Sequence, residues 1–210
     1  MNLIFLGPPG AGKGTVAGSI AKELGVPHIS TGDLFRAAIK NETPLGKQVK
    51  AILDKGDLVP DDLTIALVKE RLGEGDTKGG YILDGFPRTI PQAEALAGFS
   101  PTHGVVNFAL PDAAIIERLS GRRVCKSCGR GYHVKFMPPK REGVCDVCGG
   151  ELYTRKDDNV ESITNRLDVY RKQTHPLVEF YTNRKLIRDV DAAPAADVVL
   201  QSVRDALSKL

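Results

Sequence analysis

The chain has 210 residues, of which 41% are hydrophobic and 26% are charged. This composition is typical of a globular protein with a sizeable core and excludes an intrinsically disordered chain. Basic residues number 29 and acidic residues 26, which leaves a net charge of only +3. Such a small charge gives no reason to expect nucleic acid or a membrane as the main partner.

The first 25 residues have the pattern of a strand, a glycine-rich loop and a helix. Leu3–Leu6 is a short apolar run, as in a strand buried on both faces. No charged segment precedes it and no cleavage site follows, so we expect a strand rather than a signal peptide. The expected compartment is the cytoplasm, or a stroma or matrix if a presequence was removed. Residues 13–24 carry apolar side chains at helical spacing, and Gly25 suits the end of that helix.

Strand and helix patterns continue to alternate as far as residue 120. Short apolar runs predict buried strands, whereas apolar residues three and four positions apart predict helices. The expected strands are 27–29, 81–84 and 104–109. The expected helices are 31–41 with Ser30 as cap, 44–55, 61–72 with Asp61 as cap, 89–97, and one that begins at 111–112 with Ile115, Ile116 and Leu119 facing inward.

Residues 122–158 differ in character from the rest, because they hold all four cysteines and few apolar runs, so we expect a separate insertion. Asp158 and Glu161 then have the spacing of a capping box for the next helix. The apolar face of that helix would carry Val160, Ile163, Leu167 and Tyr170, and Pro176 would kink or end it. A strand at 187–190 and a helix at 195–209 complete an alternation that predicts a parallel sheet with helices on both faces.

The loop Gly7-Pro8-Pro9-Gly10-Ala11-Gly12-Lys13-Gly14-Thr15 has the pattern of a phosphate-binding P-loop. Its glycines let consecutive N–H groups point at one anion, and the helix that follows adds its positive end. Lys13 can reach the phosphates as a point charge. Gly14 stands where the general pattern has Ser or Thr, so the sequence leaves open whether a loop hydroxyl ligates Mg²⁺.

Two C-x2-C pairs, Cys125/Cys128 and Cys145/Cys148, are separated by sixteen residues. This spacing is typical of a tetrahedral Cys₄ zinc site, and four thiolates leave no open position for catalysis. A structural ion would help to fold an insertion that is too small to build much core. Iron instead of zinc, or two disulfides, are the alternatives.

Five segments, in order along nearly the whole chain, resemble the adenylate kinases. They are Gly7–Thr15, Ser30–Asp33, Leu83–Arg88, Gly121–Arg123 and Thr154–Asp158. The run Asp84-Gly85-Phe86-Pro87-Arg88 is specific to nucleoside monophosphate kinases, and the cysteine-bearing insertion resembles the zinc-lid branch of bacterial adenylate kinases.

The resemblance implies a P-loop NTPase-like parallel sheet flanked by helices, with a small helical AMP-binding flap and a zinc-bearing lid. The core would comprise 1–29, 60–120 and 159–210, the flap 30–59 and the lid 121–158. The implied activity is reversible, Mg²⁺-dependent phosphoryl transfer, ATP + AMP = 2 ADP, which serves nucleotide homeostasis. The implied protein is a cytoplasmic monomer whose partners are ATP, AMP and ADP, with no nucleic acid and no membrane.

By position, the resemblance also assigns residues to two nucleotide sites and to catalysis. The AMP site would comprise Thr31, Arg36, Asp57, Leu58, Val59, Gly85, Phe86, Pro87, Arg88, Gln92, Arg155 and Arg166. The ATP site would comprise Gly10, Ala11, Gly12, Lys13, Gly14, Thr15, Arg118, Arg122, Gly131, Tyr132 and Ala193. The catalytic residues would be Lys13, Asp84, Arg88, Arg122, Arg155 and Arg166.

These residue types suit phosphoryl transfer, which asks the protein for positioning and charge stabilisation. Arginine grips phosphate oxygens bidentately and stays charged. Asp84 ends an apolar strand, where ligands bind in parallel sheets, and could hold Mg²⁺ or its waters, with help from Asp33. Either acid could instead favour a helix start. Asp157 and Asp158 could orient lid arginines or cap the next helix.

Two other functions share parts of these patterns. A kinase of UMP or CMP would have the same loop and the same Asp84 run, but Thr31, Gln92 and the long lid favour AMP. A nucleic-acid-binding ATPase could use basic and aromatic residues of the insertion, such as Arg130 and Phe136, to contact bases. That function leaves the Asp84–Arg88 run unexplained.

Overall fold

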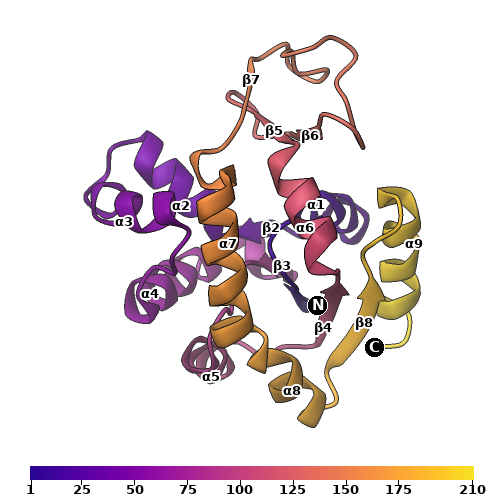
Figure 1. The fold of residues 1–210 in the computed structure, drawn as a ribbon. Helices are drawn as coiled ribbons and strands as arrows, with labels where there is room; N and C mark the ends of the chain where they lie inside the picture. Colours follow the sequence, from indigo (N-terminus) through magenta and orange to yellow (C-terminus); the bar gives the residue numbers. More distant parts are fainter.

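The computed structural model describes residues 1–210 and has a five-stranded parallel sheet at its centre, in the order β2-β3-β1-β4-β8 (Figure 1). After β1 the chain forms β2 and β3 on one side, and then crosses to the other side for β4 and β8. Ligands bind at the carboxyl ends of the strands where such a sheet changes its direction of winding. The strands are β1 Asn2–Leu6, β2 His28–Ser30, β3 Tyr81–Asp84, β4 Gly104–Ala109 and β8 Ile187–Asp191.

Helices cover both faces of this sheet. They are α1 Lys13–Leu24, α2 Thr31–Lys40, α3 Pro44–Lys55, α4 Asp61–Leu72, α5 Ile90–Phe99, α6 Asp112–Ser120, α7 Val160–Val169, α8 Pro176–Asn183 and α9 Ala196–Leu207. Short 3₁₀ helices η1 (Gly75–Thr77) and η2 (Lys156–Asp158) and the π-helical segment η3 (Tyr170–Thr174) complete the set. None of these helices combines the length and the apolar composition that a membrane crossing requires.

The core has two halves, one on each face of the sheet, and β1 contributes to both. Leu3 and Phe5 pack with the residues of α1 and α9, whereas Ile4 and Leu6 pack with those of α4, α5 and α8. This division follows from the period of two in a strand, which sends successive side chains to opposite faces. A central parallel strand is covered on both faces and therefore requires apolar residues at successive positions, as in Leu3–Leu6.

Two parts of the chain project from this core (Figure 1). Helices α2 and α3 pack on each other around Phe35, Val49 and Val59, and Gly46 allows the contact because a Cβ there would lie 2.1 Å from the Ala38 oxygen. At the top of Figure 1 lies a small antiparallel sheet, in the order β6-β5-β7, and the cysteines stand on β5 and in the loops that connect the strands. Its strands are β5 Arg122–Cys125, β6 Gly131–His133 and β7 Leu152–Tyr153.

The parallel sheet flanked by helices is confirmed, but some predicted positions are wrong. Ile116 is 46% exposed and Val160 is 73% exposed, so neither faces the core. Adjacent helical residues differ by about 100°, and Ile115, which is fully buried, takes the inward position of the pair. The side chain of Asn159, not that of Asp158, caps α7 by accepting from the Ser162 N–H at 2.9 Å.

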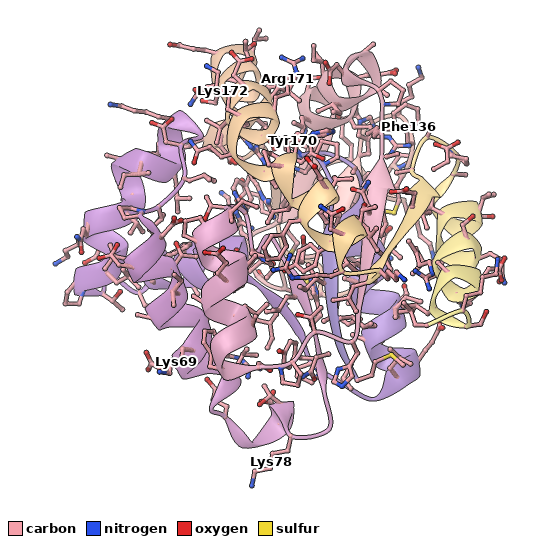
Figure 2. All side chains as sticks on the ribbon, turned by 90° about the horizontal axis from the view of Figure 1, so that it is seen from below. Lys69, Lys78, Phe136, Tyr170, Arg171 and Lys172 are labelled. Atoms are coloured by element: carbon pink, nitrogen blue, oxygen red, sulfur yellow. The ribbon has the colours of Figure 1, made fainter.

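The start of α4 also differs from expectation, whereas Pro176 does mark a break in the helical stretch that follows Asn159. Pro60 stands at the N-cap of α4, and Asp61 is the first helical residue. Pro176 begins α8 directly after η3, where its missing N–H costs little. From η3, Arg171 and Lys172 extend to the outside, whereas Tyr170 is half-buried (Figure 2).

We predict that Ile115→Ala lowers the free energy of unfolding by about 3 kcal/mol, because it opens a cavity between α6 and α7. The matched change Ile116→Ala removes the same atoms from the solvent side and is expected to cost within about 0.5 kcal/mol. Urea denaturation of both variants measures the difference. Equal losses would contradict the orientation of α6.

Candidate active site

The loop between β1 and α1 curls tightly because its glycines adopt left-handed conformations. Gly7 has φ 141° and Gly12, the N-cap of α1, has φ 85°. A Cβ on Gly7 would also lie 2.7 Å from the Phe108 oxygen on β4. The loop therefore requires glycine at these positions, and it presents the amino end of α1 at the carboxyl edge of the sheet, where an anion binds favourably.

Lys13 is held across this loop. Its Nζ donates to the carbonyl oxygens of Gly7 at 2.7 Å and Pro8 at 2.8 Å. Burial lowers the pKa of Lys13 to about 8, although the nearby carboxylate of Asp84 acts in the opposite direction. An ammonium group that is desolvated in this way gains from any anion placed beside it.

Asp84 ends β3 next to the loop. Burial alone would raise its pKa, but the close approach of the His28 ring and the charge of Lys13 outweigh burial and lower the pKa below the usual range. His28 Nε2 lies 3.4 Å from Asp84 Oδ2. A Cβ on Gly14 would lie 3.3 Å from the same oxygen, so the glycine that departs from the general P-loop pattern lets the first turn of α1 pass close to this carboxylate.

Arg88 and its neighbours form the next part of the site, at the turn after β3. Arg88 Nε and the Thr31 hydroxyl both donate to the Gly85 carbonyl, at 2.8 and 2.7 Å. The Arg88 main-chain N–H donates to the Gln92 side-chain oxygen at 2.8 Å. Phe86 is 1% exposed and packs in the core, which leaves only its backbone for a ligand.

Two further arginines, on β5 and on α7, pair with the acids of η2. Arg122 forms two hydrogen bonds with Asp158, whose side chain is fully buried, and Arg166 pairs with Asp157 at 2.8 Å and with Asp158 at 3.4 Å. Of the two alternatives for these acids, the structure therefore shows the orientation of arginines.

Arg155 has the least complete pairing. Its Nη2 lies 3.8 Å from Asp33, which is itself paired with Arg36 at 2.6 Å, and its buried Nε has no partner. Burial, with the charges of Arg36 and Arg122, lowers the pKa of Arg155 to about 10. Burial likewise lowers the pKa of Arg166 to about 10. Perturbed cations gathered in one place indicate a functional site for anions.

Other residues predicted for the two nucleotide sites lie in three further regions of the structure. Arg118 Nη2 donates to the Ala193 carbonyl at 2.8 Å, which brings these two together just before α9. Tyr132 is buried on β6 of the small antiparallel sheet, and its hydroxyl accepts from the Asp146 N–H at 2.7 Å. Asp57, Leu58 and Val59 line a cavity of about 330 Å³ after α3, together with Pro60, Asp61, Val169 and Gln173.

The four cysteine sulfurs lie within 4.8 Å of one another. Cys125 and Cys148 are 3.4 Å apart and Cys128 and Cys145 are 3.6 Å apart, too far for the disulfide length of about 2.05 Å. A tetrahedral ion with bonds of about 2.3 Å to sulfur requires separations of about 3.8 Å, so the cluster fits zinc. The Tyr132 hydroxyl lies 3.4 Å from Cys145 Sγ and lowers its pKa, which favours the thiolate.

His28 and Asp61 are two neighbours of the site that the sequence did not identify. His28 contacts Asp84, and Asp61 accepts from Gln92 and Thr89. Both contacts join elements that are far apart in the chain. Only the position of His28 two residues before the Ser30–Asp33 segment could have suggested its proximity.

A P-loop at the β1–α1 turn, an acid at the end of β3 and arginines that converge on both define a P-loop protein of the nucleoside monophosphate kinase class. A family model described as "Adenylate kinase" matches residues 5–186. The chain is 59% identical over 204 residues to an "Adenylate kinase" of Treponema denticola, which covers 97% of this chain and 98% of that protein. It is 56% identical over 214 residues to an "Adenylate kinase" of Carboxydothermus hydrogenoformans, with all of both chains covered. The chain belongs to the adenylate kinase family.

We predict that Asp158→Asn lowers the free energy of unfolding by about 3 kcal/mol, because it leaves two arginines beside a neutral amide. Asp157→Asn is expected to cost less, since Asp157 is 21% exposed and pairs with one arginine. Thermal and urea denaturation compare the two variants. Inorganic tripolyphosphate should restore part of the loss in Asp158→Asn. A smaller loss in Asp158→Asn than in Asp157→Asn would contradict the role of Asp158 as the main partner of these arginines.

Proposed function

We propose that this chain catalyses the Mg²⁺-dependent reaction ATP + AMP = 2 ADP. The observation that carries the proposal is the gathering of cations around Lys13. Besides burial, the charges of Arg88, Arg166 and Arg122 each lower the pKa of Lys13, although these residues come from the β3–α5 turn, α7 and the lid. So many cations around one point suit two polyphosphates that must meet there.

On this proposal ATP lies on the phosphate loop and AMP under α2–α3. The loop N–H groups and Lys13 would hold the β and γ phosphates, and Arg118 with Ala193 would lie near the adenine. Thr31, Arg36, Arg88 and Gln92 would hold AMP. The turn of Arg88 and the carboxyl end of β1 lie on adjacent strands, which supports placing the two phosphate chains side by side.

Asp84 would hold Mg²⁺ or its waters, and the metal would neutralise charge on the phosphates. The protein supplies no covalent nucleophile in this mechanism. Arg122, Arg155 and Arg166 would surround the phosphoryl group as it passes between the nucleotides. Their guanidinium planes stabilise charge that spreads over its oxygens in the transition state.

We also propose that 30–59 and 121–158 act as a flap and a lid on a core formed by the rest of the chain. Closure of both would bring the lid arginines over the phosphates and exclude water, which favours transfer to AMP over hydrolysis. The separate apolar clusters of the two parts support this division. We further propose that the protein works as a cytoplasmic monomer.

The first prediction of this proposal concerns the acceptor. ADP should form from ATP·Mg²⁺ and AMP, while UMP, CMP and GMP should be far poorer acceptors. Lys13→Ala should lower kcat/KM for AMP by at least about a thousandfold, because it removes the ammonium group from the phosphate loop. A coupled assay with each acceptor measures these rates.

The outcome with the panel also separates the alternatives. A preference for UMP or CMP would support a pyrimidine nucleotide kinase instead. No transfer to any acceptor by folded, metal-loaded protein would contradict kinase activity, and a gel shift with nucleic acid would then test the binding function.

For the lid we propose a structural Zn²⁺ held by Cys125, Cys128, Cys145 and Cys148. The buried positions of Cys125 and Cys145 and the exposed positions of the other two give the site an inner and an outer half. The ion would hold together a segment whose apolar cluster contains only four residues, two of which are the ligands Cys125 and Cys145.

We predict one zinc per chain and no rapid reaction of the four thiols with a thiol reagent while zinc is bound. Removal of the ion with a chelator should expose all four thiols and lower the melting temperature. Cys148→Ser should weaken zinc binding, because it replaces a ligand. Elemental analysis with thiol titration tests this, and iron in freshly purified protein, or thiols that stay protected without any metal, would contradict it.

A further inference from the structure

The carboxylate of Asp61, at the start of α4, contacts a side chain of the proposed AMP site. Its Oδ1 accepts from Gln92 Nε2 at 2.7 Å and from the Thr89 hydroxyl at 3.0 Å. Thr89 Oγ1 in turn accepts from the Gln92 main-chain N–H at 3.3 Å. The next residue, Asp62, is also in the first turn of α4 but is exposed.

Gln92 is held at both ends of its side-chain amide. The oxygen accepts from the Arg88 main-chain N–H at 2.8 Å while the nitrogen donates to Asp61, and the residue is 1% exposed. An amide has two acceptor positions on oxygen and two N–H donors. Each end therefore keeps one further position for a ligand.

These two partners allow only one orientation of the amide. A carboxylate only accepts and a main-chain N–H only donates. A rotation by 180° would place the Gln92 oxygen against Asp61 and its NH₂ group against the Arg88 N–H, which leaves buried polar groups unpaired at a substantial cost.

The orientation of this amide decides which purine it can pair with. Adenine presents an acceptor at N1 beside a donor at the 6-amino group. A 6-oxopurine such as guanine or hypoxanthine presents a donor at N1 beside an acceptor at O6. An amide with one free donor and one free acceptor complements either base, depending on which way it is turned, and a wrong pairing is strongly rejected only when the amide cannot turn.

We propose that Asp61 is a positioning residue that fixes the amide of Gln92 and thereby makes the acceptor site select 6-aminopurine over 6-oxopurine monophosphates. The inference rests on the proposed function, in which Gln92 faces AMP. Asp61 also lines the same cavity as Leu58 and Val59, two residues of the proposed AMP site. Its carboxylate therefore lies beside that site in addition to contacting Gln92.

The test measures kcat/KM for AMP, GMP and IMP, and KM for ATP, in wild type, Asp61→Asn, Asp61→Ala and the control Asp62→Asn. Asparagine can accept or donate, so Asp61→Asn removes one of the two partners that fix the amide and lowers the cost of turning it, without changing the shape of the site. The Arg88 main-chain N–H remains as the other partner. Asp62→Asn removes a negative charge from the same first turn of α4 and leaves the amide fixed. In both Asp61 variants the ratio of kcat/KM for AMP to that for GMP or IMP should fall at least about tenfold. KM for ATP and the ratio in Asp62→Asn should change less than about twofold.

A merely structural role would lower activity with all acceptors alike, together with the melting temperature. An unchanged ratio in folded Asp61→Asn, in an enzyme whose wild type prefers AMP, would overturn this inference and leave the proposed function standing. Should Asp61→Ala fail to fold, the isosteric Asp61→Asn still decides. Wild-type protein that transfers nothing to AMP would overturn the proposed function and this inference with it.

Discussion

Repulsion among buried cations is the constraint on which the rest of the structure depends. Burial lowers the pKa of Lys13 and that of Arg166, and the charges of Arg88 and Arg122 lower both further. Such a cluster is unstable unless acids or anions offset it. Asp84, together with the two acids of η2, supplies part of that compensation at the edges of the cluster. The remaining positive charge, at the end of the phosphate loop, is what two polyphosphates would neutralise.

The fold meets this constraint by carrying the cations on separate elements. The parallel sheet fixes the phosphate loop and the turn of Arg88 at one edge, while Arg122 lies on β5 of the small antiparallel sheet. Helix α7 is attached to the end of α3, because the side chains of Ser162 and Asn165 donate to the last carbonyl groups of α3, at 3.1 and 3.0 Å. Arg166 lies on the same helix, so the position of α2–α3 and the position of this guanidinium are mechanically linked.

Much of this arrangement was predictable from the sequence, because its signals are local. The apolar run of β1, the glycines of the loop and the paired cysteines each follow from short patterns. The exposure of Ile116 and Val160 was not predictable, since it depends on which side of a helix meets its neighbour. The same is true of Asn159 as the cap of α7: Asp158 has the right spacing, but the arginines on either side engage it. The contact between Asp61 and Gln92 joins two helices, and no local pattern reports it.

The pKa of Lys13 reports the burial of its ammonium group, together with the charges around the phosphate loop on which both the fold and the proposed function depend. NMR titration of the protein with ¹³C-labelled lysine, with Lys13→Arg to assign the signal, gives that value with and without ATP·Mg²⁺. We predict a pKa of about 8 in the free protein and a rise of at least about one unit when the nucleotide binds. A Lys13 signal that titrates near the ordinary lysine value of about 10.4 in the free protein, and that ATP·Mg²⁺ does not move, would contradict a buried, uncompensated cation at this loop.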